Sequence, residues 1–167
     1  ALSAAVFQDH FNKTKIISII EEDAFVNLSR KDVDVLGLAP VNLENDVLEP
    51  TTGEGFSFTQ PIFYDKVKGP CALATRQGEN QWSSFVYWTV SSTFYAEENN
   101  ITKESSNKMP LVGLFGSYHK TMFRDIISTN GNYGEMFDNN VEQLGPRTGR
   151  NLINSNGPQL CPYPGIL

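Results

Sequence analysis

The sequence predicts an α/β fold with a helical C-terminal half, and three patterns in its 167 residues indicate this class. Two short β-branched runs, at residues 15–20 and 33–36, flank a segment with helical spacing at residues 23–28. Residues 56–59 alternate between aromatic and hydroxyl side chains, as a half-buried strand does. Apolar side chains recur at three- and four-residue steps over residues 82–94, which predicts an amphipathic helix.

The two β-branched runs and the helix between them form the pattern of a βαβ unit. Because strands joined by a crossover helix pair in parallel and with right-handed connections, we expect residues 15–20 and 33–36 to belong to a parallel sheet. Ligands of such sheets tend to bind at the carboxyl ends of the strands.

The C-terminal half is predicted to contain three helices. The first has a core-facing stripe and ends near residues 98–100; the stripe consists of Trp82, Phe85, Val86, Thr89, Val90 and Phe94. The second covers residues 122–127 and stops at Asn130 and Gly131, since glycine is common just after a helix. The third covers about residues 133–141. From Gly145 onward, proline and glycine indicate an extended tail that ends the domain or wraps a partner.

Three aromatic residues of the first C-terminal helix lie off its apolar stripe: Tyr87, Trp88 and Tyr95. Either a second surface of the protein covers them, or they are exposed. Exposed aromatic side chains are common at protein interfaces, so these three are candidate interface residues.

Composition and charge restrict the classes of partner. Forty per cent of the residues are hydrophobic, which is typical of a folded chain, and the length suits one compact domain. The net charge of -6, with scattered basic residues, argues against nucleic acid or an anionic membrane surface as partner. No apolar run approaches the roughly 20 residues of a transmembrane helix, and the chain begins with neither Met nor a charged leader.

The two cysteines, Cys71 and Cys161, both lie beside prolines. A disulfide between them would stabilise the fold by about 4 to 5 kcal/mol on the chain-entropy model, and the alternative is two thiols that pack as small apolar groups. No CxxC motif or Cys/His cluster is present, and His10 and His119 stand alone, so neither a metal site nor a cofactor is expected.

Three Asn-x-Ser/Thr triplets begin at Asn12, Asn27 and Asn100. Such triplets are glycan acceptors in a eukaryotic secretory pathway. They also arise by chance in a sequence that is rich in asparagine.

The segment from Arg124 to Leu152 carries a resemblance to a known family. Its Gly131-Asn132-Tyr133-Gly134-Glu135 run, with Arg147, Gly149, Asn151 and Leu152 further on, resembles the C-terminal region of general L-amino-acid binding proteins of bacterial ABC importers, members of solute-binding protein family 3. Residues 77–82, 32–36 and 55–65 are similar to other segments of that family. The resemblance implies a periplasmic-binding-protein-like (type II) fold.

Two parts of that family's fold are absent from the sequence, so the resemblance implies a truncated version of the fold. The family's first strand would precede Ala1, and most of its second lobe would lie between Gly69 and Pro70. We therefore expect a lobe-1-like segment at residues 1–69 and a helical segment with an extended tail at residues 70–167, packed as one compact domain.

The resemblance also places the family's ligand loop on this chain. The loop follows the Asp-Val-Leu strand, and the candidate ligand-binding residues are Gly37, Leu38, Ala39, Val41, Asn45 and Asp46. In the family an arginine of this loop grips the ligand's carboxylate, and here Asn45 or Asp46 takes its place. The hydroxyl side chains of the loop are replaced by Ala39, Pro40 and Val41.

These departures lead to a functional hypothesis. We expect a non-catalytic protein of solute-binding ancestry that acts as an accessory or structural subunit of a larger extracytoplasmic complex. The alternative is the amino-acid-binding component of an ABC-type uptake system. Expected partners are other protein subunits, including those of a membrane complex. The resemblance implies a location in the periplasm, the extracellular space or an organelle lumen such as that of the thylakoid. An enzyme is not expected, because no nucleophile motif or carboxylate pair with suitable spacing is present.

Overall fold

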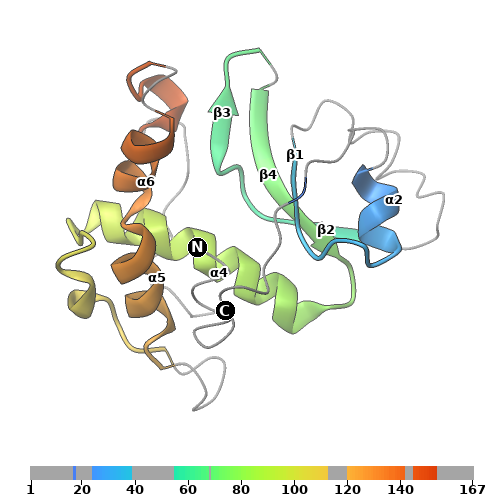
Figure 1. Cartoon of the computed structure of the whole chain (residues 1–167), viewed down its shortest axis with the longest axis horizontal. Helices are drawn as coiled ribbons and strands as arrows, with labels where there is room; N and C mark the ends of the chain where they lie inside the picture. The colour runs from blue at the N-terminus through green and yellow to red at the C-terminus, as the bar shows by residue number, and fades with distance from the viewer. Residues whose placement is uncertain are drawn as a thin grey trace. The chain divides into compact units, whose positions relative to one another are not determined.

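The computed structural model describes residues 17, 24–38, 55–67, 69–112, 120–141 and 145–153. It divides into two compact units, residues 16–87 and residues 1–15 with 88–167. Helix α4, Asn80–Glu98, begins in the first unit and ends in the second (Figure 1).

Strand β4, Gly69–Arg76, is the centre of the sheet in the unit of residues 16–87. It pairs antiparallel with β1, Leu36–Leu38, on one side and with β2, Phe56–Phe58, on the other. Ala74 is the register partner of both Leu36 and Phe58. Because β4 has neighbours along both edges, the position of each shorter strand depends on it.

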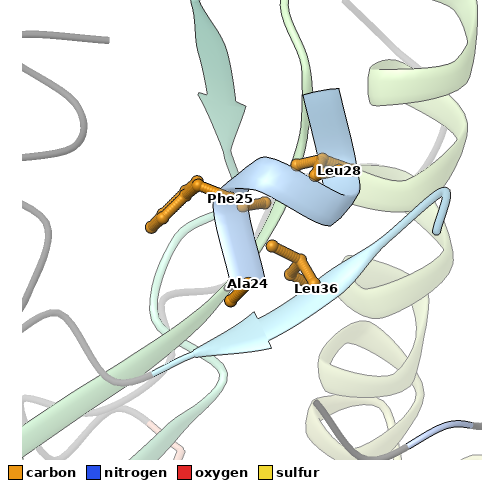
Figure 2. Close-up of a cluster of buried hydrophobic side chains, with 5 residues drawn as sticks. Ala24, Phe25, Leu28 and Leu36 are labelled. Atoms are coloured by element: carbon orange, nitrogen blue, oxygen red, sulfur yellow. The ribbon is translucent and has the colours of Figure 1, made fainter. Parts of the chain in front are cut away.

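Helix α2, Ala24–Ser29, packs against this sheet and forms the core of the unit. Figure 2 shows the side chains of α2 meeting that of Leu36 from β1. The buried cluster consists of Ala24, Phe25, Leu28, Leu36 and Ala74, with Val33 and Phe56 against its margin. The rings of Phe25 and Phe56 lie 4.7 Å apart, so an aromatic contact joins the helix to β2.

Strand β3, Phe63–Asp65, turns directly back into β4. Asp65 is the register partner of Gly69, and the Asp65 carboxylate accepts a hydrogen bond of 2.8 Å from the Val67 amide. Gly69 has a φ of 85°, a conformation that favours glycine at the start of the returning strand. The Gly69–Pro70 bond, where the resemblance places a second lobe, is thus part of a hairpin.

The guanidinium of Arg76, at the end of β4, joins three segments of this unit. Its Nη1 donates to the carbonyls of Leu28 at 3.1 Å and Val33 at 2.9 Å. Its Nη2 and Nε form ion pairs with Asp34 and Glu79. Since the Arg76 side chain is only 10% exposed, these acceptors replace the water that a guanidinium would otherwise bind.

The second unit is helical in its described part. After the end of α4 come a 3₁₀ turn, η4, at Ser106–Lys108 and helix α5 at Met122–Asn130, which pack against each other. Helix α6 at Tyr133–Asn140 and a second 3₁₀ turn, η7, at Gly149–Asn151 follow. The fully buried side chains of this unit include Phe94, Met109, Phe123 and Ile127. Gly131 ends α5 with a φ of 81° and donates its amide to the Ile127 carbonyl.

The α/β class, the segment of α2 and the three C-terminal helices agree with the sequence predictions. The strand predicted at residues 33–36 corresponds to β1, which begins only at Leu36, the last residue of the predicted range. Residues 15–20 lie outside the described residues except residue 17, which has no regular structure. The described strands all pair antiparallel, so they do not form the parallel pairing expected from the βαβ pattern.

The organisation predicted around Gly69 differs from the structure in two respects. Residues 70–76 were expected in a helical segment, but with Gly69 they form the central strand of the sheet. Their sequence combines Pro70 with two alanines, which strands disfavour, so local propensity gave no strand signal. The compact units divide between Tyr87 and Trp88, inside α4, whereas the predicted boundary lies between residues 69 and 70.

We predict that Arg76→Ala destabilises the unit of residues 16–87 by about 3 kcal/mol, because the substitution leaves two backbone carbonyls and Glu79 without their donor. Urea unfolding monitored by circular dichroism would measure the loss. Faster hydrogen exchange in α2 would locate it.

Asp34→Asn is the matched control for Arg76→Ala. The Asp34 side chain is 74% exposed, so its ion pair is screened by water and the expected loss is below about 1 kcal/mol. Equal losses for both variants would contradict a structural role that rests on the two carbonyl contacts.

Candidate functional site

The candidate ligand loop begins inside the described part of the chain and then leaves it. Gly37 and Leu38 are the last two residues of β1. Ala39, Val41, Asn45 and Asp46 lie outside the described residues. Gly37 is exposed, and β1 has β4 as its neighbour on one side only among the described strands. The exposed backbone at Gly37 is therefore the part of this candidate site that the structure defines.

A side chain at Gly37 would fit the fold. Among the described residues, a Cβ added there would meet the Leu73 side chain alone, at 3.7 Å, which is an ordinary van der Waals contact. The strand does not require glycine for packing, but glycine allows another molecule to approach the backbone closely.

Arg76, a cation that could in principle hold a carboxylate, is already committed within the unit. All three of its guanidinium nitrogens donate to protein acceptors. Burial is the largest influence on the pKa of Arg76 and lowers it, but the hydrogen bonds and charges of Glu79 and Asp34 outweigh burial and raise that pKa. A ligand carboxylate would have to displace one of these two acids. Arg30, by contrast, is exposed at the end of α2.

The Asn132-Tyr133-Gly134-Glu135 motif forms the start of α6. The Asn132 side chain accepts from the Glu135 amide at 2.9 Å, and the Glu135 carboxylate accepts from the Asn132 amide at 2.8 Å. This reciprocal pair is a capping box, which satisfies two amides that the helix leaves without partners. Asn132 also donates to the Ile101 carbonyl, and Glu135 accepts from the Lys103 amide. The motif thus ties α6 to the segment after α4.

The next part of the motif packs against a bidentate ion pair. Arg147 donates from Nη1 to one carboxylate oxygen of Glu97 at 2.7 Å and from Nη2 to the other. Its guanidinium carbon lies 5.5 Å from the centre of the Tyr133 ring, within the range of a cation–π contact. A Cβ at Gly134 would lie 3.2 Å from Arg147 and 3.3 Å from Glu97. Glycine therefore leaves room for the ion pair.

Tyr133 is 8% exposed, and its ring meets that of Phe94 edge to face at 4.9 Å. Its hydroxyl is buried and has no hydrogen-bond partner among the described residues. Burial raises the pKa of the Tyr133 phenol to about 12, with the Arg147 charge opposing and the Glu97 charge adding to the effect. The hydrogen bonds of Glu97 raise the pKa of Arg147 more than burial lowers it. The cluster holds a charged pair against a neutral phenol.

The three aromatic interface candidates are not exposed in the chain. Trp88 is 4% exposed, and Tyr87 and Tyr95 are half-buried. The sequence left two alternatives for Trp88, exposure or cover by a second surface of the protein. The structure shows cover, because the second half of α4 is buried on several faces. Cys71 is half-buried on β4, and Cys161 lies outside the described residues, so their disulfide stays a prediction.

No group of three or more metal-ligating side chains occurs within the described ranges. In the same part of the chain, no helix has the length and apolar character to cross a bilayer. The adjacent acids Glu97 and Glu98 do not form a catalytic pair, because the Glu97 carboxylate is bound by Arg147 on both oxygens.

Comparison with known proteins gives several related sequences, although no protein-family model matches the chain. A putative amino-acid ABC transporter-binding protein, YhdW of Escherichia coli, is 32% identical over 115 residues, 57% of this chain and 34% of that protein. The general L-amino acid-binding periplasmic protein AapJ of Rhizobium johnstonii is 33% identical over 116 residues, with the same coverage of 57% and 34%. The glutamate/glutamine/aspartate/asparagine-binding protein BztA of Rhodobacter capsulatus is 33% identical over 90 residues, 44% of this chain and 27% of that protein.

Among solved structures, an ABC transporter periplasmic binding protein from Brucella ovis with glutathione bound is 27% identical and has a TM-score of 0.44. The match covers 57% of this chain and 36% of the Brucella ovis chain.

The curated relatives are named as binding proteins, two of them of ABC transporters or the periplasm. The chain is similar to these amino-acid-binding proteins and diverged from them, at 32% to 33% identity. It spans about a third of the length of the curated relatives it matches. Relatives of this kind support the amino-acid-binding alternative better than the expected accessory subunit.

We predict that Asn132→Ala destabilises the second unit by about 1 to 2 kcal/mol, because it removes the helix cap and a hydrogen bond to a buried carbonyl. Denaturant unfolding would measure the change. Asn140→Ala, at the exposed end of the same helix, is the matched control and should change stability by less than about 0.5 kcal/mol. A control effect as large as the Asn132 effect would contradict the capping role.

We predict a loss of stability at alkaline pH that depends on Tyr133. The pKa of its phenol is about 12 in the folded chain and 10.0 in the reference state, so the folded state holds the proton more tightly. This contribution is complete below pH 10 and is lost as the pH rises toward 12. Unfolding measured across that range should show the loss for the parent chain.

Tyr133→Phe should remove this part of the alkaline loss and leave stability at pH 7 within about 0.5 kcal/mol, because the hydroxyl has no described partner. An unchanged alkaline profile in this variant would show that another group causes the loss.

Proposed function

We propose that this chain is the amino-acid-binding component of an ABC-type uptake system located outside the cytoplasm. The observation that supports the proposal most is its similarity to three curated proteins named for amino-acid binding, at 32% to 33% identity. Their names cover general, acidic and amide-bearing amino acids, so the proposed substrate class is L-amino acids. On this proposal the chain is not an enzyme, and its partners are the membrane subunits of the transporter.

The geometry at β1 is compatible with such a site. Gly37 exposes backbone that a zwitterionic ligand can approach, and backbone amides and carbonyls can bind its carboxylate and ammonium groups. Arg76 would take no part, because its nitrogens hold Leu28, Val33 and two acids. The proposed mode therefore uses strand backbone where the family uses an arginine of the loop.

We predict that an L-amino acid raises the melting temperature of the chain. A ligand that binds only the folded state at about 100 times its Kd stabilises it by about 2.7 kcal/mol, which for a chain of this size is roughly 5 to 11 °C. Thermal unfolding with L-glutamine, L-glutamate, L-alanine and L-arginine would measure the shift. The matched D-enantiomers are the control.

Gly37→Val tests the location of the site. A Cβ at this position makes an ordinary contact with Leu73, and valine favours strands, so the melting temperature without ligand should stay near that of the parent, while the ligand-induced shift should fall. A full shift in this variant would place the site elsewhere. No shift of the parent chain with any L-amino acid would contradict the proposed function itself.

The hairpin at Gly69 favours a second candidate, the accessory subunit. Because β3 returns directly into β4, the chain has no second lobe at the point where the resemblance expects one. An accessory subunit would show no ligand-induced shift and would form a stable complex with another protein of the transporter, which native mass spectrometry can detect.

A further inference from the structure

Asn100 occupies a special position at the end of α4. It has a φ of 53°, in the left-handed region, and its side chain is exposed. The Asn100 amide donates to the Glu97 carbonyl at 3.0 Å, and the Ile101 amide donates to the Ala96 carbonyl at 2.7 Å. This pair of bonds is a Schellman motif, in which the left-handed residue ends the helix. The Asn100 side chain therefore lies at the surface, just outside the last helical turn.

The Asn27 triplet occupies a very different environment. Asn27 is inside α2 and half-buried, and the next residue, Leu28, is 0% exposed in the core. The Asn27 carbonyl also accepts the amides of Asp32 and Val33. A large polar group on Asn27 would have to fit beside these contacts, whereas one on Asn100 would extend into water. Asn12 lies outside the described residues.

We propose that Asn100 is the N-glycosylation site of this chain. The donor is an oligosaccharide linked to a lipid pyrophosphate. The Asn100 amide nitrogen bonds to the anomeric carbon of the sugar, the bond from that carbon to the phosphate oxygen breaks, and lipid pyrophosphate leaves. The amide loses one proton to the solvent through the transferase. This inference does not rest on amino-acid binding.

The test uses the full chain, secreted through the eukaryotic endoplasmic reticulum and, in parallel, into the periplasm of a bacterium that carries an oligosaccharyltransferase. Peptide mass spectrometry after enzymatic removal of glycans in water enriched in oxygen-18 would identify the modified residue, because the asparagine becomes an aspartate that carries the heavy oxygen. We expect a glycan on Asn100 in both hosts. Thr102→Ala should abolish it, and Thr102→Ser should restore it, because serine also completes the triplet.

One further variant makes the test specific. Asn27→Gln should leave the Asn100 glycan in place in both hosts. A glycan on Asn27 or Asn12 with Asn100 unmodified would overturn the proposal, as would an unmodified chain in both hosts.

Discussion

The contact of Arg76 with the carbonyls of Leu28 and Val33 determines the arrangement of the unit formed by residues 16–87. A guanidinium that is nearly buried requires hydrogen-bond acceptors for its N–H groups. For Arg76 these acceptors belong to the end of α2, the turn before β1 and the residue just before α4. Lysine could not replace it, since the three donors on one ammonium nitrogen cannot reproduce the planar fork of three nitrogens that meets four acceptors here. The same contacts that build the unit make Arg76 unsuitable as a ligand-binding cation.

The second unit uses a similar device with different residues. Arg147 binds Glu97 on both oxygens beside the buried Tyr133 ring, and Asn132 with Glu135 caps α6. Residues of the motif that resembles amino-acid-binding proteins are thus engaged in packing and capping. Such a motif can persist because the fold needs it, while the ligand loop diverges. This explains why similarity to the family defines the architecture more firmly than the ligand.

Sequence patterns predicted the helices well because their signals are local. The periodic stripe gave the first C-terminal helix, Gly131 marked the end of α5, and the helical spacing after residue 22 gave α2. Strand β4 was missed, because its proline and alanines form a strand only where neighbours on both edges supply hydrogen bonds. Trp88 was proposed for an interface, yet it is buried. Helical periodicity identifies one buried face, and it does not reveal that other segments cover the remaining faces.

The sequence by itself determined the α/β class and the similarity to amino-acid-binding proteins. These depend on local spacing and on residue identity, which are readable in one dimension. Only the tertiary structure decided that the guanidinium of Arg76 donates to acceptors within the protein, that Gly69 belongs to a hairpin and that Tyr133 lies beside an ion pair. The physical reason is that each of these depends on partners distant in sequence: Leu28 lies 48 residues from Arg76, and Glu97 lies 50 residues from Arg147.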